Sequence, residues 1–322
     1  MYYNPLDELL ISIKNAGGFV NAHAHFDRAY TVSKQNMRDV VYSQLKEKWK
    51  LVDEYKAFAT QKDYEQNITT ALQGQILMDT HKCFSFIDLD PVVGWKAIRA
   101  AKKVQSQFND KLVFKYGFQT LKGVLEPDCM RMMEESVDRG LVDALGSLPA
   151  ADKNPDLHLG FLMNLAQHSG LPLHVHVDQN NTDAEKETEM LARETMKWGL
   201  EGRVVAIHGI SIACHPKKYR QEVYKMLKDA GIYFVTCPTA WIDSRRTERM
   251  SPTHNAITPV DEMVEAGINV ALGTDNIHDI YKPYSTGDMS IELKFLLEAT
   301  HIYDHEVLFD IAVTNGEKIL SL

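Results

Sequence analysis

The sequence predicts a (β/α)₈ TIM barrel, and two observations carry that prediction. Short apolar, β-rich runs alternate with amphipathic stretches along the whole chain of 322 residues, without internal repeats. This alternation is typical of parallel strands joined by helices. In addition, several of the apolar runs end in residue types that bind metals. An open doubly wound sheet is the alternative, but it would not bring four strand ends around one ion so readily as a barrel mouth does.

The expected strands are short runs rich in Val, Ile, Phe and Leu. They cover about residues 18–24, 82–89, 111–118, 143–148, 172–178, 203–209, 231–237 and 267–274. Amphipathic, helix-like segments lie between them, and several begin at or near Pro or Asp, a common helix start. These segments are Pro91–Gln107, Pro127–Arg139, Asp156–His168, Asp183–Trp198, Pro216–Ala230 and Pro259–Ala266.

Two connections are longer than the usual link between a strand and a helix. The first, about residues 27–80, contains the aromatic and charged helical stretch Val40–Phe58. It is expected either to cover the barrel mouth or to form a solvated helical hairpin on the barrel side. The second, Ala240–Thr258, contains Arg245 and Arg246 and is expected on the active-site face. The sequence therefore predicts a single barrel domain over residues 1–322, with a long helical insertion and without an accessory β-sandwich.

Composition narrows the class of protein. The net charge is −9, and no basic tract offsets it, which argues against a nucleic-acid partner. No apolar run is long enough to span a bilayer, and the first residues lack the pattern of a signal peptide. The four cysteines are scattered without C-x-x-C spacing, as in a reduced cytoplasmic protein. A small-molecule substrate is expected, and a homo-oligomer is possible.

Candidate metal ligands end four of the expected strands. His23 and His25 are two residues apart, so in a strand they point to the same face. His176, His208 and Asp275 end later strands. Thirteen histidines could give one His-x-His pair by chance, but not this whole set at strand ends. Neutral imidazoles with a carboxylate suit one Zn²⁺ or Fe²⁺ ion. His174 lies deeper in its strand and is expected in the core or behind the ligands.

The motifs that surround these residues resemble the amidohydrolase superfamily, specifically its cytosine deaminase-like branch. The resemblance runs over nearly the whole chain and includes His23-Ala24-His25-Phe26-Asp27, His176-Val177-Asp178-Gln179 and Gly273-Thr274-Asp275-Asn276. It implies that His23, His25, His176 and Asp275 bind one ion and that His208 orients the attacking water. The implied reaction is hydrolysis of a non-peptide C–N bond by metal-bound hydroxide, with Asp275 as general base.

The departures from that branch bear on the substrate. Cytosine deaminases carry a proton-shuttling Glu where this chain has Gln179, whose amide has no useful acid–base pKa. The Gln that contacts the pyrimidine is replaced by Leu121, with Gln119 nearby. Cytosine deamination is therefore not expected. Deamination or amine removal on another small heterocycle, amidine or amide is favoured.

Several further residues are candidates for substrate contact or proton transfer. Arg28 follows the first metal strand and either contacts an acidic or carbonyl group of the substrate or forms a salt bridge at the rim. Trp241 is a candidate ring-stacking wall, and Asp178 and Asp279 are candidates for the missing proton shuttle. The alternative function is a catalytically altered barrel that binds metal and ligand without turnover.

Overall fold

Parallel strands follow one another round a closed ring in the computed structural model, which describes residues 3–43, 45–242 and 255–322. The strands in this part of the chain are β1 (Phe19–Asn21), β2 (Thr80–Asp88), β3 (Val113–Gln119), β4 (Leu145–Ser147), β5 (Leu173–Val177), β6 (Val204–His208), β7 (Tyr233–Thr236) and β8 (Val270–Leu272). They form two parallel sheets, β1-β2-β3 and β4-β5-β6-β7-β8.

Backbone contacts in two places join these sheets into a barrel. An isolated parallel bridge between Gly117 and Ala144 connects β3 to the residue before β4. Beyond β1 and β8, the Asp275 amide donates to the His23 carbonyl at 3.0 Å. This closure needs Gly273, because a Cβ there would lie 2.9 Å from His23 backbone and side-chain atoms. The predicted TIM barrel is confirmed.

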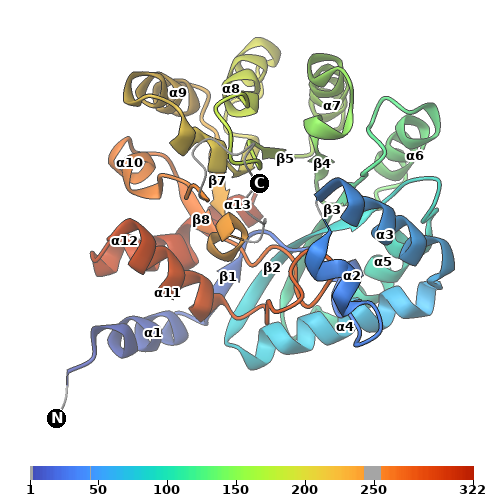
Figure 1. The fold of residues 1–322 in the computed structure, drawn as a ribbon, viewed down its shortest axis with the longest axis horizontal. Helices are drawn as coiled ribbons and strands as arrows, with labels where there is room; N and C mark the ends of the chain where they lie inside the picture. The colour runs from blue at the N-terminus through green and yellow to red at the C-terminus, as the bar shows by residue number, and fades with distance from the viewer. Residues whose placement is uncertain (1–2, 44, 243–254) are drawn as a thin grey trace.

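Helices surround the strands (Figure 1). They are α1 (Pro5–Asn15), α2 (Met37–Tyr42), α3 (Leu45–Phe58), α4 (Gln61–Leu77), α5 (Lys96–Phe108), α6 (Pro127–Asp138), α7 (Pro155–Ser169), α8 (Glu187–Trp198), α9 (Lys217–Asp229), α10 (Val260–Glu265), α11 (Met289–Thr300), α12 (His305–Phe309) and α13 (Asn315–Leu320). Short helical turns are η1 (Phe26–Arg28), η2 (Pro149–Ala151), η3 (Ile210–Cys214), η4 (Pro238–Ile242) and η5 (Asp310–Thr314). Within the described ranges, no helix has the length and apolar character needed to cross a membrane.

Two expected helices begin later than the sequence suggested. Helix α8 starts at Glu187 rather than near Asp183, because the Asp178 carboxylate accepts from the backbone amides of Glu187 and Thr188 at 2.8 and 3.2 Å. These bonds satisfy amides of the first turn that have no partner inside the helix. Helix α5 likewise begins at Lys96, after a turn.

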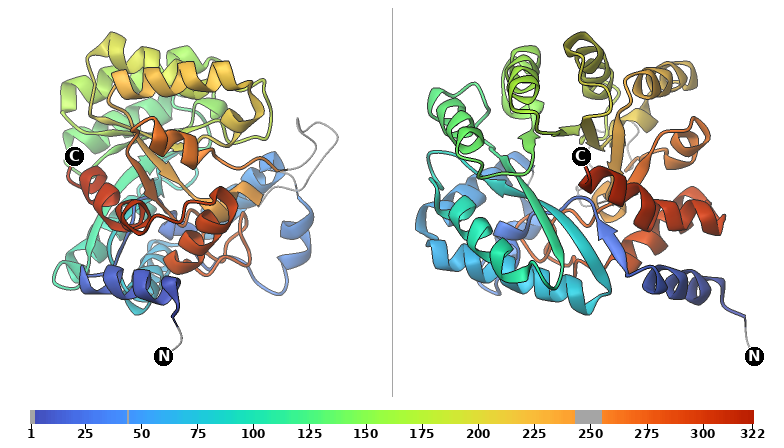
Figure 2. Two further views of the ribbon diagram at one scale, coloured as in Figure 1. Left: turned by 90° about the vertical axis from the view of Figure 1, so that its left-hand side faces the viewer. Right: turned by 180° about the vertical axis from the view of Figure 1, so that it is seen from behind.

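The long connection after β1 is folded against the barrel. Helix α4 packs on α5 and on β2, in the outer helical layer. Helix α3 lies at the carboxyl end of the strands, where the buried Lys56 Nζ is 2.9 Å from Asp88 Oδ2 and 2.8 Å from Asp90 Oδ2. Lys48 Nζ of the same helix donates to the Tyr281 carbonyl at 3.0 Å. The connection was expected either to cover the barrel mouth or to form a hairpin on the barrel side. These contacts match the position at the mouth. The C-terminal helix α13 lies at the opposite end (Figure 2, right).

Candidate metal-binding active site

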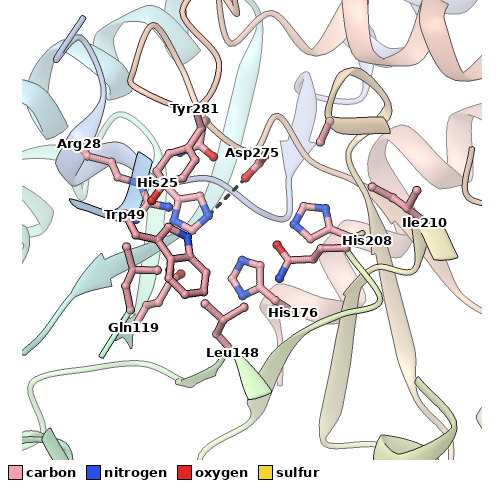
Figure 3. A pocket seen from close by; sticks show the side chains of 14 residues that line it. His25, Arg28, Trp49, Gln119, Leu148, His176, His208, Ile210, Asp275 and Tyr281 are labelled. Atoms are coloured by element: carbon pink, nitrogen blue, oxygen red, sulfur yellow. Dashed lines mark ion pairs between the residues drawn. The ribbon is translucent and has the colours of Figure 1, made fainter. Parts of the chain in front are cut away.

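Five side chains from four strand ends meet inside the barrel mouth, and we call them the strand-end cluster: His23, His25, His176, His208 and Asp275. The His23 ring centroid is 4.9 Å from those of His25 and His176 and 5.5 Å from that of His208. All five residues are buried. Figure 3 shows His176 and His208 on one side of the pocket and His25 with Asp275 on the other.

The backbone of two residues of the cluster is strained. His208 and Asp275 have φ angles of 78° and 59°, in the left-handed region that non-glycine residues seldom adopt. Each such residue costs of the order of 1–3 kcal/mol and persists only where the surroundings hold it. At His208, one of the holding contacts is a 2.6 Å hydrogen bond from Thr258 Oγ1 to its carbonyl.

Interatomic distances in the cluster fit a small cation. Asp275 Oδ1 lies 3.4 Å from His23 Nε2 and 3.3 Å from His25 Nε2. Two ligands of a tetrahedral zinc ion are about 3.3 Å apart when each metal–ligand bond is about 2.0–2.1 Å. Within the described residues, both His23 ring nitrogens and His25 Nδ1 are buried without a hydrogen-bond partner. His176 Nδ1 is 3.2 Å from the Ser147 carbonyl, which leaves its Nε2 available to an ion.

The protonation states also suit a cation. Burial holds the pKa of His25 and of His176 well below the usual imidazole value. Burial likewise lowers the pKa of His208 to about 4. Burial alone would raise the pKa of Asp275, but its contacts with His23 and His25 hold it well below the ordinary carboxyl value. Neutral imidazoles beside an ionised carboxylate are the ligand forms that metal ions require.

A pocket opens onto the cluster and encloses ≈ 600 Å³ of space, including solvent at its mouth. Three of the predicted substrate-binding residues line it, Arg28, Gln119 and Leu121. Gln179, predicted at a catalytic position, lines it as well. The remaining lining residues outside the cluster are Trp49, Leu148, Ile210, Ala240, Asn276 and Tyr281. The pocket therefore joins an apolar surface to a few polar groups, as small-molecule sites commonly do.

The structure does not place Trp241 in this pocket. Its side chain is 2% exposed and packs against Phe295, with ring centroids 6.0 Å apart. Ala240 lines the pocket instead, because successive residues of the helical turn η4 point in different directions. The predicted connection Ala240–Thr258 also contains Arg245 and Arg246, which lie outside the described residues.

The two carboxylates considered as proton shuttles do not line the pocket either. Asp178 caps helix α8, as described above. Asp279 is fully buried; its Oδ1 accepts from the backbone amides of Tyr281 and Lys282 at 2.9 and 3.0 Å, and its Oδ2 accepts from Asn276 Nδ2. Both carboxylates therefore hold the backbone in place rather than face the substrate.

His174, which was expected in the core or behind the ligands, stacks on Phe84, with ring centroids 4.1 Å apart.

Six of the described lining residues were not among the candidates from the sequence, and two of them, Trp49 and Tyr281, are large aromatic side chains. Trp49 reaches the pocket from α3, and Tyr281 from the loop between β8 and α11. The aromatic content of Val40–Phe58 was a signal for the first. For Tyr281 the sequence offers only its place six residues after Asp275, which does not set the direction of its side chain.

A barrel of this topology with a His-rich mouth is the class of fold to which metal-dependent amidohydrolases belong. The model of the amidohydrolase family matches residues 87–309, so the chain belongs to that family. The matched range begins within β2 and therefore does not include His23 and His25. The protein is a metal-dependent hydrolase of carbon–nitrogen bonds other than peptide bonds, in the deaminase-like branch of its superfamily.

Curated relatives are consistent with this assignment. The chain is 40% identical over 255 residues to an uncharacterized protein of Haemophilus influenzae, covering 77% of this chain and 91% of the relative. It is 25% identical over 277 residues to N-isopropylammelide isopropyl amidohydrolase of Pseudomonas sp. strain ADP. That match covers 84% of this chain but only 65% of the relative.

Among solved structures, the chain is similar to 5-methylcytosine deaminase from Klebsiella pneumoniae bound to phosphonocytosine. The TM-score is 0.86 at 24% identity, over 94% of this chain and 75% of that chain. A second similar structure is N-isopropylammelide isopropylaminohydrolase from Burkholderia multivorans, with a TM-score of 0.79 at 16% identity, over 95% of this chain and 75% of that one. At these identities the likeness establishes the fold.

Proposed function

We propose that the protein removes an amino or alkylamino group from a small nitrogen heterocycle, or hydrolyses a related amidine or amide. The observation that carries this proposal is the strand-end cluster, in which neutral imidazoles and an ionised carboxylate converge at the base of a pocket. The names of the relatives, which include an alkylamine-removing amidohydrolase and a 5-methylcytosine deaminase, support the same class of substrate.

His23, His25, His176 and Asp275 are proposed to hold one divalent ion, Zn²⁺ or Fe²⁺. The first three offer ring nitrogens within 4.8 Å of one another, as do the ligand atoms of His23, His208 and Asp275. When bound, such an ion lowers the pKa of a coordinated water towards neutrality and so supplies the nucleophile.

Proton transfer and the orientation of the attacking water are assigned to two members of the cluster, Asp275 and His208. Asp275 is ionised, so its carboxylate takes the proton of the attacking water and passes it to the departing amine. His208 is neutral at physiological pH because its pKa lies at about 4. It therefore orients the water, or the oxyanion that forms from it, by hydrogen bonding.

Gln179 is proposed to position the substrate. It lines the pocket, and its amide can donate and accept hydrogen bonds but cannot exchange protons at neutral pH. Apart from the cluster, the described titratable groups that line the pocket are Arg28 and Tyr281. Neither is an acid of suitable strength, since burial raises the pKa of the Tyr281 hydroxyl. The proposed chemistry therefore depends on Asp275 and His208 alone.

Metal analysis and product release on one preparation test this proposal. The protein is assayed for ammonia or alkylamine release from cytosine, 5-methylcytosine, guanine, N-isopropylammelide and simple cyclic amidines. We expect about one equivalent of metal and turnover of at least one member of the panel. A full equivalent of metal with no turnover of any member would favour the alternative, a barrel that binds metal and ligand without catalysis.

The cellular location and the oligomeric state complete the proposal. The scattered cysteines fit the reducing environment of the cytoplasm, so this is the location we propose. Assembly into a homo-oligomer is compatible with the family assignment and is tested by light scattering of the purified protein.

A further inference from the structure

Behind His176, three side chains form a series of hydrogen bonds that the proposed chemistry does not use. We call Ser147, His158 and Asp152 the Ser–His–Asp chain. Ser147 Oγ lies 2.8 Å from His158 Nε2, and His158 Nδ1 lies 2.6 Å from Asp152 Oδ2. Ser147 ends β4, Asp152 follows η2, and His158 lies near the start of α7. The Ser147 carbonyl is also the group that His176 Nδ1 faces, at 3.2 Å, so the chain reaches the back of the candidate metal site.

The donors and acceptors along the Ser–His–Asp chain have one consistent assignment. Burial lowers the pKa of His158, so its ring is neutral. Burial alone would raise the pKa of Asp152, but hydrogen bonds from His158 and from the Val124 amide hold it below the ordinary carboxyl value. A carboxylate only accepts, so His158 Nδ1–H donates to Asp152. His158 Nε2 then accepts from the Ser147 hydroxyl, and the Ser147 side chain is held in one orientation.

The residue types are those of a hydrolytic triad, but this serine is not placed to act as a nucleophile. Ser147 is 1% exposed, and it is not among the described residues that line the pocket. A nucleophilic serine needs its Oγ within reach of the substrate carbonyl. His158 is fully buried as well. The hydrogen bonds of the chain therefore hold the backbone rather than perform chemistry.

The Ser–His–Asp chain lies at the junction between the two sheets of the barrel. In the part of the chain that the structure describes, this junction has an isolated bridge between Gly117 and Ala144 instead of a continuous ladder. Asp152 Oδ2 accepts from the Val124 amide at 2.7 Å, and Val124 belongs to the loop after β3. Gly123 has a φ of 87° and leaves room for this carboxylate, since a Cβ there would overlap Asp152 Oδ1. The same carboxylate therefore ties the segment after β4 to the loop after β3.

We infer that the Ser–His–Asp chain positions His176 as a metal ligand. By holding the end of β4, the chain fixes the carbonyl that accepts from His176 Nδ1, and this bond leaves His176 Nε2 to the ion. Asp152, His158 and Ser147 are thus positioning residues, which act on the metal through His176. The inference rests on the proposed function in one respect, that His176 binds the metal.

The affinity of the folded protein for metal tests this inference. The purified full-length protein is loaded with Zn²⁺, and a chromophoric chelator of known affinity competes for the ion. His158→Phe keeps a ring but loses both hydrogen bonds, and it should bind Zn²⁺ about 10–100-fold more weakly than the wild type, as is usual when the support of a metal ligand is lost. Ser147→Ala is a milder change, which removes one hydrogen bond and should weaken Zn²⁺ binding about tenfold.

His215→Phe is the matched control. His215 is also buried, and its Nε2 lies 2.8 Å from the Glu185 carbonyl, so the variant loses a buried hydrogen bond that does not lead to His176. Its Kd for Zn²⁺ should equal that of the wild type. The Co²⁺-loaded proteins give a second readout, because the visible absorption of Co²⁺ reports the geometry of its ligands. The absorption bands should change in His158→Phe and stay unchanged in His215→Phe.

A double-mutant cycle separates the chain from independent packing effects. If Ser147 and His158 act in sequence, the double variant Ser147→Ala/His158→Phe should lose no more Zn²⁺ affinity than His158→Phe alone. Fully additive losses would contradict a single chain. Unchanged Zn²⁺ affinity in both single variants, or an equal loss in His215→Phe, would overturn the inference.

The same preparations separate this inference from the proposed function. If His176→Ala loses the metal while the variants of the chain bind Zn²⁺ as tightly as the wild type, the proposed metal site stands and the inference fails. Weaker Zn²⁺ binding by the variants of the chain, without turnover of any substrate by the wild type, would support the inference and count against the proposed reaction.

Discussion

Two groups of residues line one pocket but arise in different ways: the strand-end cluster, and a second group that we call the arginine wall, made of Arg28, Trp49, Gln119 and Tyr281. The cluster is made by residues at the ends of β1, β5, β6 and β8, which barrel closure brings together. Three members of the wall, Arg28, Trp49 and Tyr281, come from segments between strands, and Arg28 is held by its contacts with Asp88 and Tyr281. We therefore expect the strand ends of the barrel to determine the reaction, and residues mostly from the connections to determine which substrate binds.

The largest effect is expected at the cluster. Asp275→Asn removes both a proposed metal ligand and the proposed general base, so kcat should fall by on the order of 10⁴ or more. The measurement is steady-state kinetics on the best substrate of the panel. Asp178→Asn is the matched control, since the Asp178 carboxylate caps α8 outside the pocket, and its kcat should stay within about threefold of the wild type. Equal losses in the two variants would contradict the assignment of Asp275.

Gln179 lines the same pocket, and a smaller effect, on binding, is expected there. Gln179→Ala should raise KM by about 10–100-fold, because one or two hydrogen bonds to substrate are lost. The pH–rate profile should keep its shape, since no titrating group is removed. The converse change, Gln179→Glu, should give little cytosine deamination, because Leu121 also lines the pocket and cannot pair with the ring edge. Ready cytosine turnover by that variant would show that the rest of the pocket already fits a pyrimidine.

Within the wall, Trp49 should act by packing alone. Trp49→Ala should raise KM about tenfold, the order expected when an aromatic contact to a ring is lost, and should leave the metal content unchanged. Trp49→Phe keeps a flat surface and should recover most of the binding. If kcat fell while KM stayed constant, Trp49 would belong to the catalytic machinery rather than to the wall.

The smallest expected effect concerns stability behind the cluster. Burial raises the pKa of Glu187 to about 8 from an ordinary 4.5, so the folded state favours its protonated form. The associated stability is complete below about pH 4.5 and is lost as the pH rises towards 8. Glu187→Gln removes this loss, so from pH 5 to 8 the wild type should lose about 1–2 kcal/mol relative to the variant. Urea unfolding at both pH values measures the difference, and identical pH dependence would contradict the assignment.

The sequence predicted the cluster because its geometry is local. The strand period places His23 and His25 on one face, and parallel strands in a barrel end at one mouth. The same reasoning extended to Gln179 and Gln119, which end or follow strands and line the pocket.

What the sequence could not supply depends on contacts between distant segments. Trp241 and Ala240 are adjacent, and only the direction of the turn η4 decides which of them faces the pocket. Asp178 follows a metal strand, but its left-handed φ of 52° turns its carboxylate towards the start of α8. Trp49 enters the pocket because Lys48 and Lys56 bind α3 to the barrel, and no local periodicity encodes those ion pairs and hydrogen bonds.

The metal content of two variants of one strand tests the central claim most directly. His174 and His176 are both buried in β5, but His176 belongs to the strand-end cluster whereas His174 stacks on Phe84 in the core. Elemental analysis of folded protein should give about one equivalent of metal for the wild type and for His174→Ala, and close to none for His176→Ala. A full equivalent retained by His176→Ala, with the metal lost from His174→Ala instead, would contradict the proposed ligand set.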